Sequence, residues 1–268
     1  AFRDVSVFVE QFFIECRLAS FTVKSRRYVD FSALGYYVPP DLESEDLRQY
    51  RNYMDGLFRA YGALLEAGVP REDARFLLPY SFHSNFYCTL NARELARALC
   101  EIRYGRGRNI PELQTLADQL TAQLEERFPC LLPEIRPSFE GSPAGEVPSL
   151  RCSQADPVYL TRQEAGAVAL VNAPAEPMKL LEAAWRIQHP SKEQPFTPAE
   201  LAASQRPREL EQLAYTFTVS NVTLSGVTHL VRHRMQSIIV PSIQSVDHSR
   251  VILPDSVAAD PAALERYQ

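Results

Sequence analysis

Two stretches of the chain carry arginine and serine at matching spacing. Val231–Ser242 reads VRHRMQSIIVPS, and Ile14–Tyr28 reads IECRLASFTVKSRRY. The same interval of 217 positions separates three pairs of identical residues, Arg17 and Arg234, Ser20 and Ser237, and Ser25 and Ser242. Guanidinium groups bind phosphates through paired hydrogen bonds and stack on planar rings. The pattern therefore predicts a site for a phosphorylated ligand with a flat ring, such as a nucleotide or a flavin.

Other chemistries fit these residues less well. His229 and His233 stand at metal-ligand spacing on a helix, but the glutamate of the zinc motif H-E-x-x-H is absent, and Arg232 would repel a divalent cation. We expect no metal site. Neither Ser25 nor Ser242 lies in a G-x-S-x-G nucleophile elbow, so both are interpreted as binding residues. The sequence also lacks a G-x-G-x-x-G loop and a Walker A motif.

The two stretches retain different halves of the pattern. Glu15 and Cys16 occupy the positions that correspond to Arg232 and His233, whereas Arg27 has no counterpart in the second stretch. A tandem repeat in which each copy supplies half of a site would produce this distribution. Decay of both copies, with no site left, is the alternative.

The helices and strands that must position these residues are predicted from the spacing of apolar residues and from the positions of proline and glycine. Apolar residues at helical spacing, with Pro70 and Pro111 at helix starts, predict four helices in the first half, at 44–68, 70–79, 92–104 and 110–128. The aromatic and β-branched segment 86–91 predicts a short strand or an extended loop. In the second half we expect strands at 157–161 and 212–220, and helices at 165–173, 177–187 and 222–237. Four prolines between Pro133 and Ser149 indicate a linker.

Composition restricts the class of protein. The 268 residues are 46% hydrophobic and 23% charged, which is typical of a soluble globular protein. A net charge of −5 disfavours a nucleic-acid binder, and no apolar run is long enough for a membrane span. The N-terminus lacks signal-peptide order, and five cysteines without a C-x-x-C pair favour reduced thiols in a cytoplasmic protein.

The Arg-His-Arg triplet followed by serine resembles the signature of the flavin-dependent thymidylate synthases (ThyX). The full family pattern is Arg-His-Arg-x-x-Ser-x-Asn-x-x-Ser-x-Arg-Tyr. The first copy is similar to its tail through Arg17, Ser20, Ser25, Arg27 and Tyr28. Residues 68–79 and 86–103 resemble family segments of the same order. The resemblance covers most of residues 1–128 and, more weakly, residues 155–255.

The resemblance implies an α+β fold in which a small, mainly antiparallel sheet packs against long helices. It implies two divergent partial copies, at residues 1–132 and 150–268, joined by a Pro-rich linker at 133–149. Either the chain is cut from a longer tandem repeat or intervening stretches are missing from it. Because family sites form between the subunits of a homotetramer, we expect a homodimer of tandem chains or a homotetramer.

The resemblance also implies reductive methylation of dUMP to dTMP, with FAD as cofactor and with NADPH and methylenetetrahydrofolate as co-substrates. The residues it assigns to FAD are Arg232, His233, Arg234, Asn91 and Arg93. Those it assigns to dUMP are Ser25, Arg27, Arg75 and Arg103.

The chain departs from the family pattern inside both copies. The family's Asn and Glu are replaced by Thr22 and Val23 in the first copy, and by Ile239 and Val240 in the second. Two alternatives to an active enzyme therefore remain: a catalytically degenerate homologue that binds flavin or nucleotide, and a scaffold whose repeats only pack together.

Overall fold

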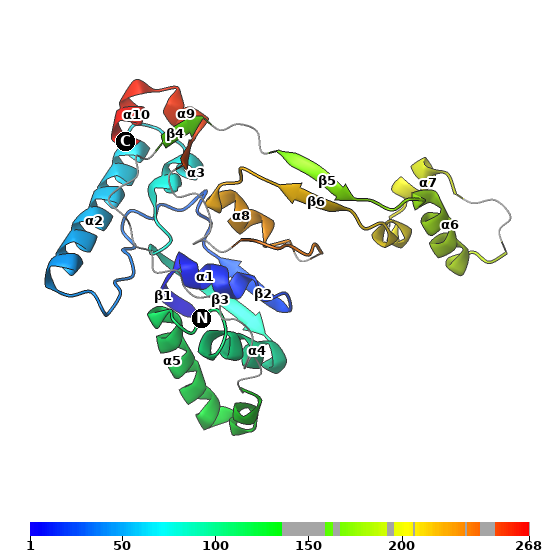
Figure 1. The fold of residues 1–268 in the computed structure, drawn as a ribbon, viewed down its shortest axis with the longest axis horizontal. Helices are drawn as coiled ribbons and strands as arrows, with labels where there is room; N and C mark the ends of the chain where they lie inside the picture. Colours follow the sequence, from blue (N-terminus) through cyan, green and yellow to red (C-terminus); the bar gives the residue numbers. More distant parts are fainter. Residues whose placement is uncertain are drawn as a thin grey trace. The chain divides into compact units, whose positions relative to one another are not determined.

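The computed structural model describes residues 1–135, 159–162, 167–191, 196–205, 207–233, 235–241 and 250–267. The chain forms two compact units, drawn in Figure 1. Unit 1 comprises Ala1–Gln163 together with Thr223–Gln268, and unit 2 comprises Glu164–Val222. All but the first three residues of the expected linker at 133–149 lie outside the described residues. The boundaries of the two copies stay a prediction.

A three-stranded antiparallel sheet organises unit 1, in the order β1-β3-β2. The strands are β1 (Phe2–Ser6), β2 (Ala19–Val23) and β3 (His83–Leu90). β3 contains the aromatic and β-branched run at 86–91, for which a short strand or an extended loop was predicted, and the strand is the alternative that the structure adopts. Helix α1 (Val7–Ile14) connects β1 to β2.

Three of the four helices predicted in the first half are present as α2 (Ser44–Glu66), α4 (Ala92–Arg103) and α5 (Pro111–Arg127), and the fourth, at 70–79, is divided into two short elements. Asn91 caps α4, because its side chain accepts a hydrogen bond from the Glu94 backbone N–H at 2.9 Å. Shorter elements are α3 (Arg71–Ala74) and the 3₁₀ helices η1 (Arg75–Leu77) and η2 (Pro129–Glu134).

Unit 1 has two hydrophobic clusters. The first packs α1 and β3 against α4 and α5, and includes Phe13, Phe86, Leu99 and Leu113. The second packs α2 against the C-terminal elements β7 (Arg250–Leu253), α9 (Asp255–Ala258) and α10 (Pro261–Tyr267). β7 pairs in parallel with β4 (Tyr159–Arg162). Segments far apart in sequence therefore meet in one unit.

Helix α8 (Leu224–Leu230) is shorter than the helix expected at 222–237. Its N-cap is Thr223, whose side chain accepts a hydrogen bond from the Gly226 backbone N–H at 3.1 Å. The helix ends before the Arg-His-Arg triplet, and Arg232 lies in the turn that follows it. Arg234 lies outside the described residues.

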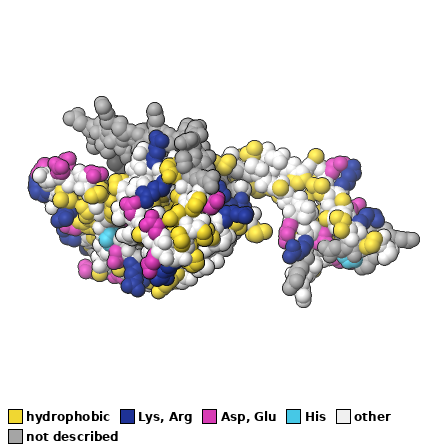
Figure 2. All heavy atoms as spheres, turned by 90° about the horizontal axis from the view of Figure 1, so that it is seen from below, with side chains coloured by type: hydrophobic (Ala, Val, Ile, Leu, Met, Phe, Trp, Pro, Cys, Tyr) yellow, Lys and Arg dark blue, Asp and Glu magenta, His cyan; other side chains and the backbone are white. Residues whose placement is uncertain are grey.

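Unit 2 contains an antiparallel pair, β5 (Val168–Asn172) and β6 (Thr216–Val219), which form a ribbon. Its other elements are α6 (Pro177–Gln188), α7 (Pro198–Ala202) and η3 (Arg208–Gln212). The expected helix at 165–173 was wrong, because β5 gains hydrogen bonds from β6 that a short, valine-rich segment does not obtain alone. Hydrophobic side chains lie along the ribbon (Figure 2), and those exposed on its strands are Val168, Leu170, Val171, Phe217 and Val219.

Candidate functional site

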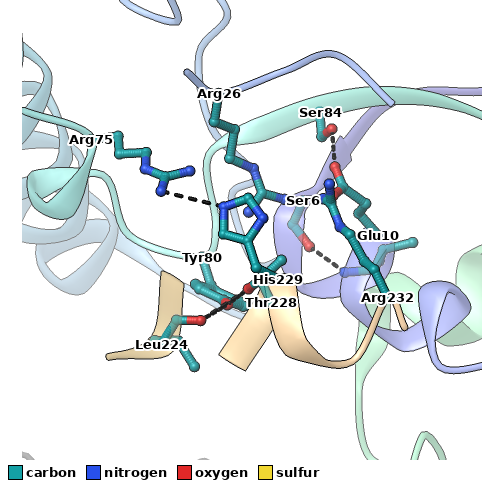
Figure 3. A network of polar contacts seen from close by, with 11 residues as sticks. Ser6, Glu10, Arg26, Arg75, Tyr80, Ser84, Leu224, Thr228, His229 and Arg232 are labelled. Atoms are coloured by element: carbon teal, nitrogen blue, oxygen red, sulfur yellow. Dashed lines mark hydrogen bonds and ion pairs between the residues drawn. The ribbon is translucent and has the colours of Figure 1, made fainter. Parts of the chain in front are cut away.

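Basic side chains from both motif copies meet in unit 1. We call Arg26, Arg75, His229 and Arg232 the arginine group (Figure 3). Arg26 follows β2, Arg75 begins η1, and the other two residues come from α8 and the turn after it. Residues separated by more than 200 positions are thus joined in one polar network.

Glu10 of α1 is the carboxylate of this network, and its side chain is fully buried. Its Oε1 accepts from Arg26 Nη2 at 2.5 Å and from Arg232 Nη2 at 3.1 Å. The Ser84 hydroxyl of β3 donates to Oε2. A buried carboxylate is tolerated only when it is paired and hydrogen-bonded, and Glu10 meets both conditions.

Arg26 is the most buried arginine of the group, with 8% of its side chain exposed. Burial lowers the pKa of its guanidinium, and the neighbouring Glu10 carboxylate opposes that shift. The guanidinium lies over the Phe82 ring, 5.6 Å from its centroid. In the described part of the chain the buried Nε has no hydrogen-bond partner, which leaves one donor for an anionic oxygen.

His229 faces Arg75, with Nε2 3.5 Å from Arg75 Nη2. Because arginine has no acceptor, His229 Nε2 accepts and the proton of the neutral ring lies on Nδ1. Partial burial lowers the pKa of His229, and the charges of Arg75, Arg232 and Arg26 lower it further. His229 is therefore neutral near pH 7 and can gain a proton when an anion offsets the arginines.

Tyr80 anchors α8 to the rest of unit 1. Its hydroxyl donates to the Leu224 carbonyl at 3.1 Å and contacts the Thr228 hydroxyl. Burial raises the pKa of Tyr80, so the phenol keeps its proton. This contact fixes the start of α8, and thereby the place of His229 one turn later.

Of the residues predicted to bind dUMP, two meet at Glu72. Arg27 Nε donates to the Glu72 carboxylate at 2.8 Å, and Arg75 Nε donates to the Glu72 backbone carbonyl at 3.0 Å. Ser25 Oγ accepts from the Arg27 backbone N–H at 3.3 Å. Arg103 lies elsewhere, at the end of α4, where it pairs with Asp118 at 2.5 Å.

The residues predicted to bind FAD fall into two places. Arg232 belongs to the arginine group, and the exposed His233 follows it. Asn91 and Arg93 lie at the start of α4, where Asn91 caps the helix and Arg93 is exposed. The described contacts include none that joins these two places.

The arginine group has an excess of positive charge, because Glu10 is one carboxylate against three guanidinium groups, of which it contacts two. Arg232 remains 36% exposed, so a ligand in solution can reach it. Guanidinium groups with free donors in a partly buried setting bind phosphate or carboxylate groups well.

Sequence reasoning did not assign three members of this network. The sequence analysis gave Arg26 no role and considered His229 only as a metal ligand. Glu10 was missed, although a single carboxylate inside the apolar run VSVFVEQFF is a signal for a paired, buried charge.

Residues 1–130 match the family described as "Thymidylate synthase complementing protein". A flavin-dependent thymidylate synthase of Geobacter sulfurreducens is 40% identical over 83 residues, which are 30% of this chain and 36% of that protein. The Kosmotoga olearia enzyme of the same name is 33% identical over 112 residues, covering 35% of this chain and 48% of that protein. The chain thus spans about half, or less, of the length of these two relatives.

A solved structure also resembles the chain, a UMP/dUMP methylase PolB from Streptomyces cacaoi bound with 5-Br dUMP. It shares 26% sequence identity, and the match covers 49% of this chain and 65% of that one. The TM-score of 0.39 is too low for the two folds to be equated. Among the described residues of this chain, no helix is long and apolar enough to cross a membrane.

Proposed function

We infer that residues 1–130 belong to the family of flavin-dependent thymidylate synthases, and from that premise we propose that the protein methylates dUMP reductively to dTMP. In this proposal methylenetetrahydrofolate donates the carbon, NADPH is the reductant, and FAD is the cofactor. The observation that carries the proposal is the arginine group, which joins side chains of both motif copies around one buried carboxylate.

The arginine group supplies what a nucleotide monophosphate requires. Arg75 and Arg232 are positive and reachable from solvent, and Arg26 has a buried donor without a partner in the described part of the chain. The phosphate of dUMP would take these donors. His229 would add a further positive charge once it is protonated, and Arg27 with Ser25 would border the site.

The donor set also fits FAD in part. Arg232, which would be shared with the dUMP phosphate, and His233 suit the pyrophosphate of FAD, whereas Asn91 and Arg93 form a second polar site at the start of α4. Bound FAD would supply the hydride that reduces the transferred methylene to a methyl group. The protein itself would hold the nucleotide in position and stabilise its charge.

The residues assigned to FAD lie in two separate regions of the chain, as expected if a cofactor site is shared between two chains. We therefore propose that the Arg232 place of one chain and the Asn91 place of another contribute to the same cofactor site, in a homodimer of tandem chains or a homotetramer. The division of residues between the copies supports this composite arrangement.

The test is dTMP formation by the purified protein with dUMP, methylenetetrahydrofolate, NADPH and FAD. We expect NADPH oxidation that depends on dUMP and stops when either dUMP or the folate is omitted. Arg75→Gln should abolish turnover, whereas Arg48→Gln, an exposed arginine on α2 paired with Glu45, should leave it unchanged. Equal rates in these two variants would contradict the proposed site.

A second candidate function is binding without turnover. It is favoured by the replacement of the family's Asn and Glu by Thr22 and Val23 in the first copy. A yellow protein that binds dUMP but forms no dTMP would establish it. A colourless protein that binds neither ligand would exclude both functions.

A further inference from the structure

Glu10 of α1 joins elements from three other parts of unit 1. Arg26 comes from the turn after β2, Ser84 from β3, and Arg232 from the turn after α8. All three donate to Glu10, whose side chain is fully buried (Figure 3).

The two motif copies are complementary at this contact. The position 217 residues after Glu10 is Val227, and the position 217 residues before Arg232 is Glu15. The buried carboxylate therefore exists only in the first copy, and the arginine that reaches it exists only in the second. The pair forms because different copies meet, and neither copy could make it with itself.

The two arginines that Glu10 holds differ in exposure. Arg26 is 8% exposed and Arg232 is 36% exposed. Arg26 neutralises Glu10 inside the protein, whereas Arg232 uses one Nη for Glu10 and keeps part of its guanidinium at the surface. Fixing one edge of a guanidinium lowers the entropy cost of binding a ligand with its other donors.

We infer that Glu10 is a positioning residue, which holds the Arg232 guanidinium of the second copy beside Arg75 and so completes the anion site. The inference rests on the proposed function, because it assigns Arg232 to that site. It adds that the carboxylate, which itself contacts no ligand, sets the site's affinity through Arg232.

A double-mutant cycle between Glu10→Gln and Arg232→Gln tests this, with dUMP binding measured by calorimetry. Glu10→Gln should weaken dUMP binding about tenfold in the native background and less than about twofold in the Arg232→Gln background. The same factor in both backgrounds would mean that Glu10 acts on the fold generally. Tighter binding in Glu10→Gln would mean that Glu10 competes with the ligand for arginine, and would also overturn the inference.

Thermal unfolding without ligand separates this inference from the proposed function. The loss of melting temperature in the double variant should be smaller than the sum of the single losses by roughly 2 °C or more, since the residues are in contact. The matched control is Glu10→Gln with Arg106→Gln, whose losses should add, because Arg106 contacts Glu15. Additive losses for Glu10 and Arg232 would overturn the inference even if dUMP binds. Failure of the native protein to bind dUMP, with coupling intact, would overturn only the proposed function.

Ser84→Ala provides a milder variant if Glu10→Gln does not fold. It leaves both charges in place and removes one hydrogen bond to Glu10 Oε2. We expect dUMP binding to weaken by about two- to fivefold when Arg232 is present and to be unchanged in Arg232→Gln. A weakening that does not depend on Arg232 would contradict the inference.

Discussion

Helices α1 and α8 begin at corresponding positions of the two motif copies but lie in different surroundings. Ser6 caps α1 and Thr223, 217 positions later, caps α8, each through its side-chain oxygen and the backbone N–H three residues on. Most of α1 is buried, whereas Thr228 is the buried residue described for α8. The interval of 217 positions thus relates two helices with the same kind of cap, and the neighbouring elements decide how deeply each helix is buried.

The segments after these helices differ in the same way. Ala19–Val23 is strand β2 and pairs with β3. The corresponding residues, 236–240, are not in a strand, and Ile239 is 98% exposed. A strand requires a partner for its backbone groups, and β3 serves only the first copy among the described residues.

The largest expected difference between the copies is in core packing. Phe13 is fully buried in the first hydrophobic cluster, and its counterpart Leu230 is 38% exposed. Phe13→Ala should lower the free energy of unfolding by about 3–5 kcal/mol, because it leaves a cavity between α1 and β3. Leu230→Ala should lower it by less than about 1 kcal/mol.

Urea titration of both variants, followed by circular dichroism, measures this difference. The slope of the free energy of unfolding against urea should stay constant if only stability changes. Similar losses in the two variants would mean that α8 is buried in solution as deeply as α1, and the comparison would fail.

The second expected difference concerns the charge at another pair of corresponding positions, Arg232 and Glu15. Arg232→Glu would place a second carboxylate beside the buried Glu10 and remove a donor from the anion site. We expect flavin binding to weaken by about 1–4 kcal/mol, the repulsion of like charges at about 4 Å in a partly solvated site. Glu15→Gln should leave flavin binding intact, since Glu15 contacts Arg106.

Flavin bound per chain after desalting, read from visible absorbance, gives the result. We expect one flavin per tandem chain in the native protein, because the first copy lacks the arginine at position 15. Two flavins per chain, or full retention in Arg232→Glu, would show that the copies do not divide the site between them.

Much of the first half of the fold could be predicted from the sequence. Helices α2, α4 and α5 have strong apolar periodicity, and β3 has an aromatic, β-branched run, so local signals were enough. The segment at 165–173 was predicted as a helix because its short apolar run suits either structure. Its state depends on pairing with β6, which lies more than 40 residues away.

The candidate site was also predictable only in part, because some of its contacts depend on residues far apart in the sequence. The interval of 217 positions identified Arg232 as the residue that only the second copy supplies. It did not show that Arg232 contacts Glu10, since that contact depends on the tertiary structure, in which Tyr80 binds the start of α8 and the turn after α8 lies beside Glu10. Asn91 was assigned to FAD from the family pattern, yet its side chain also caps α4.

The third expected difference is between the two caps. Ser6→Ala should lower the free energy of unfolding by about 1–2 kcal/mol, because Ser6 is buried and its hydroxyl accepts from Val9. Thr223→Ala should cost about 0.5–1 kcal/mol, since α8 is short and partly exposed. Thr223→Ser, which keeps the hydroxyl, is the matched control and should be close to neutral. A larger loss for Thr223→Ala than for Ser6→Ala would reverse the comparison.

The smallest expected effect arises where the first copy has Phe12 and the second has His229. Burial and the nearby arginines lower the folded-state pKa of His229 below its ordinary value of 6.5. The unfolded chain therefore binds more protons between the two values, so the contribution of His229 to stability is full above about pH 6.5 and is lost as the pH falls below it. Melting temperatures measured from about pH 7.5 down to about pH 5.5 should fall less steeply in His229→Gln than in the native protein. Saturating phosphate should also reduce the slope of the native protein, because an anion beside Arg75 and Arg232 favours protonated His229. Identical slopes for the native protein and His229→Gln would mean that the charges of the neighbouring arginines do not shift the pKa of His229. The exchange of Phe12 for His229 between the corresponding positions would then have no effect on the pH dependence of stability.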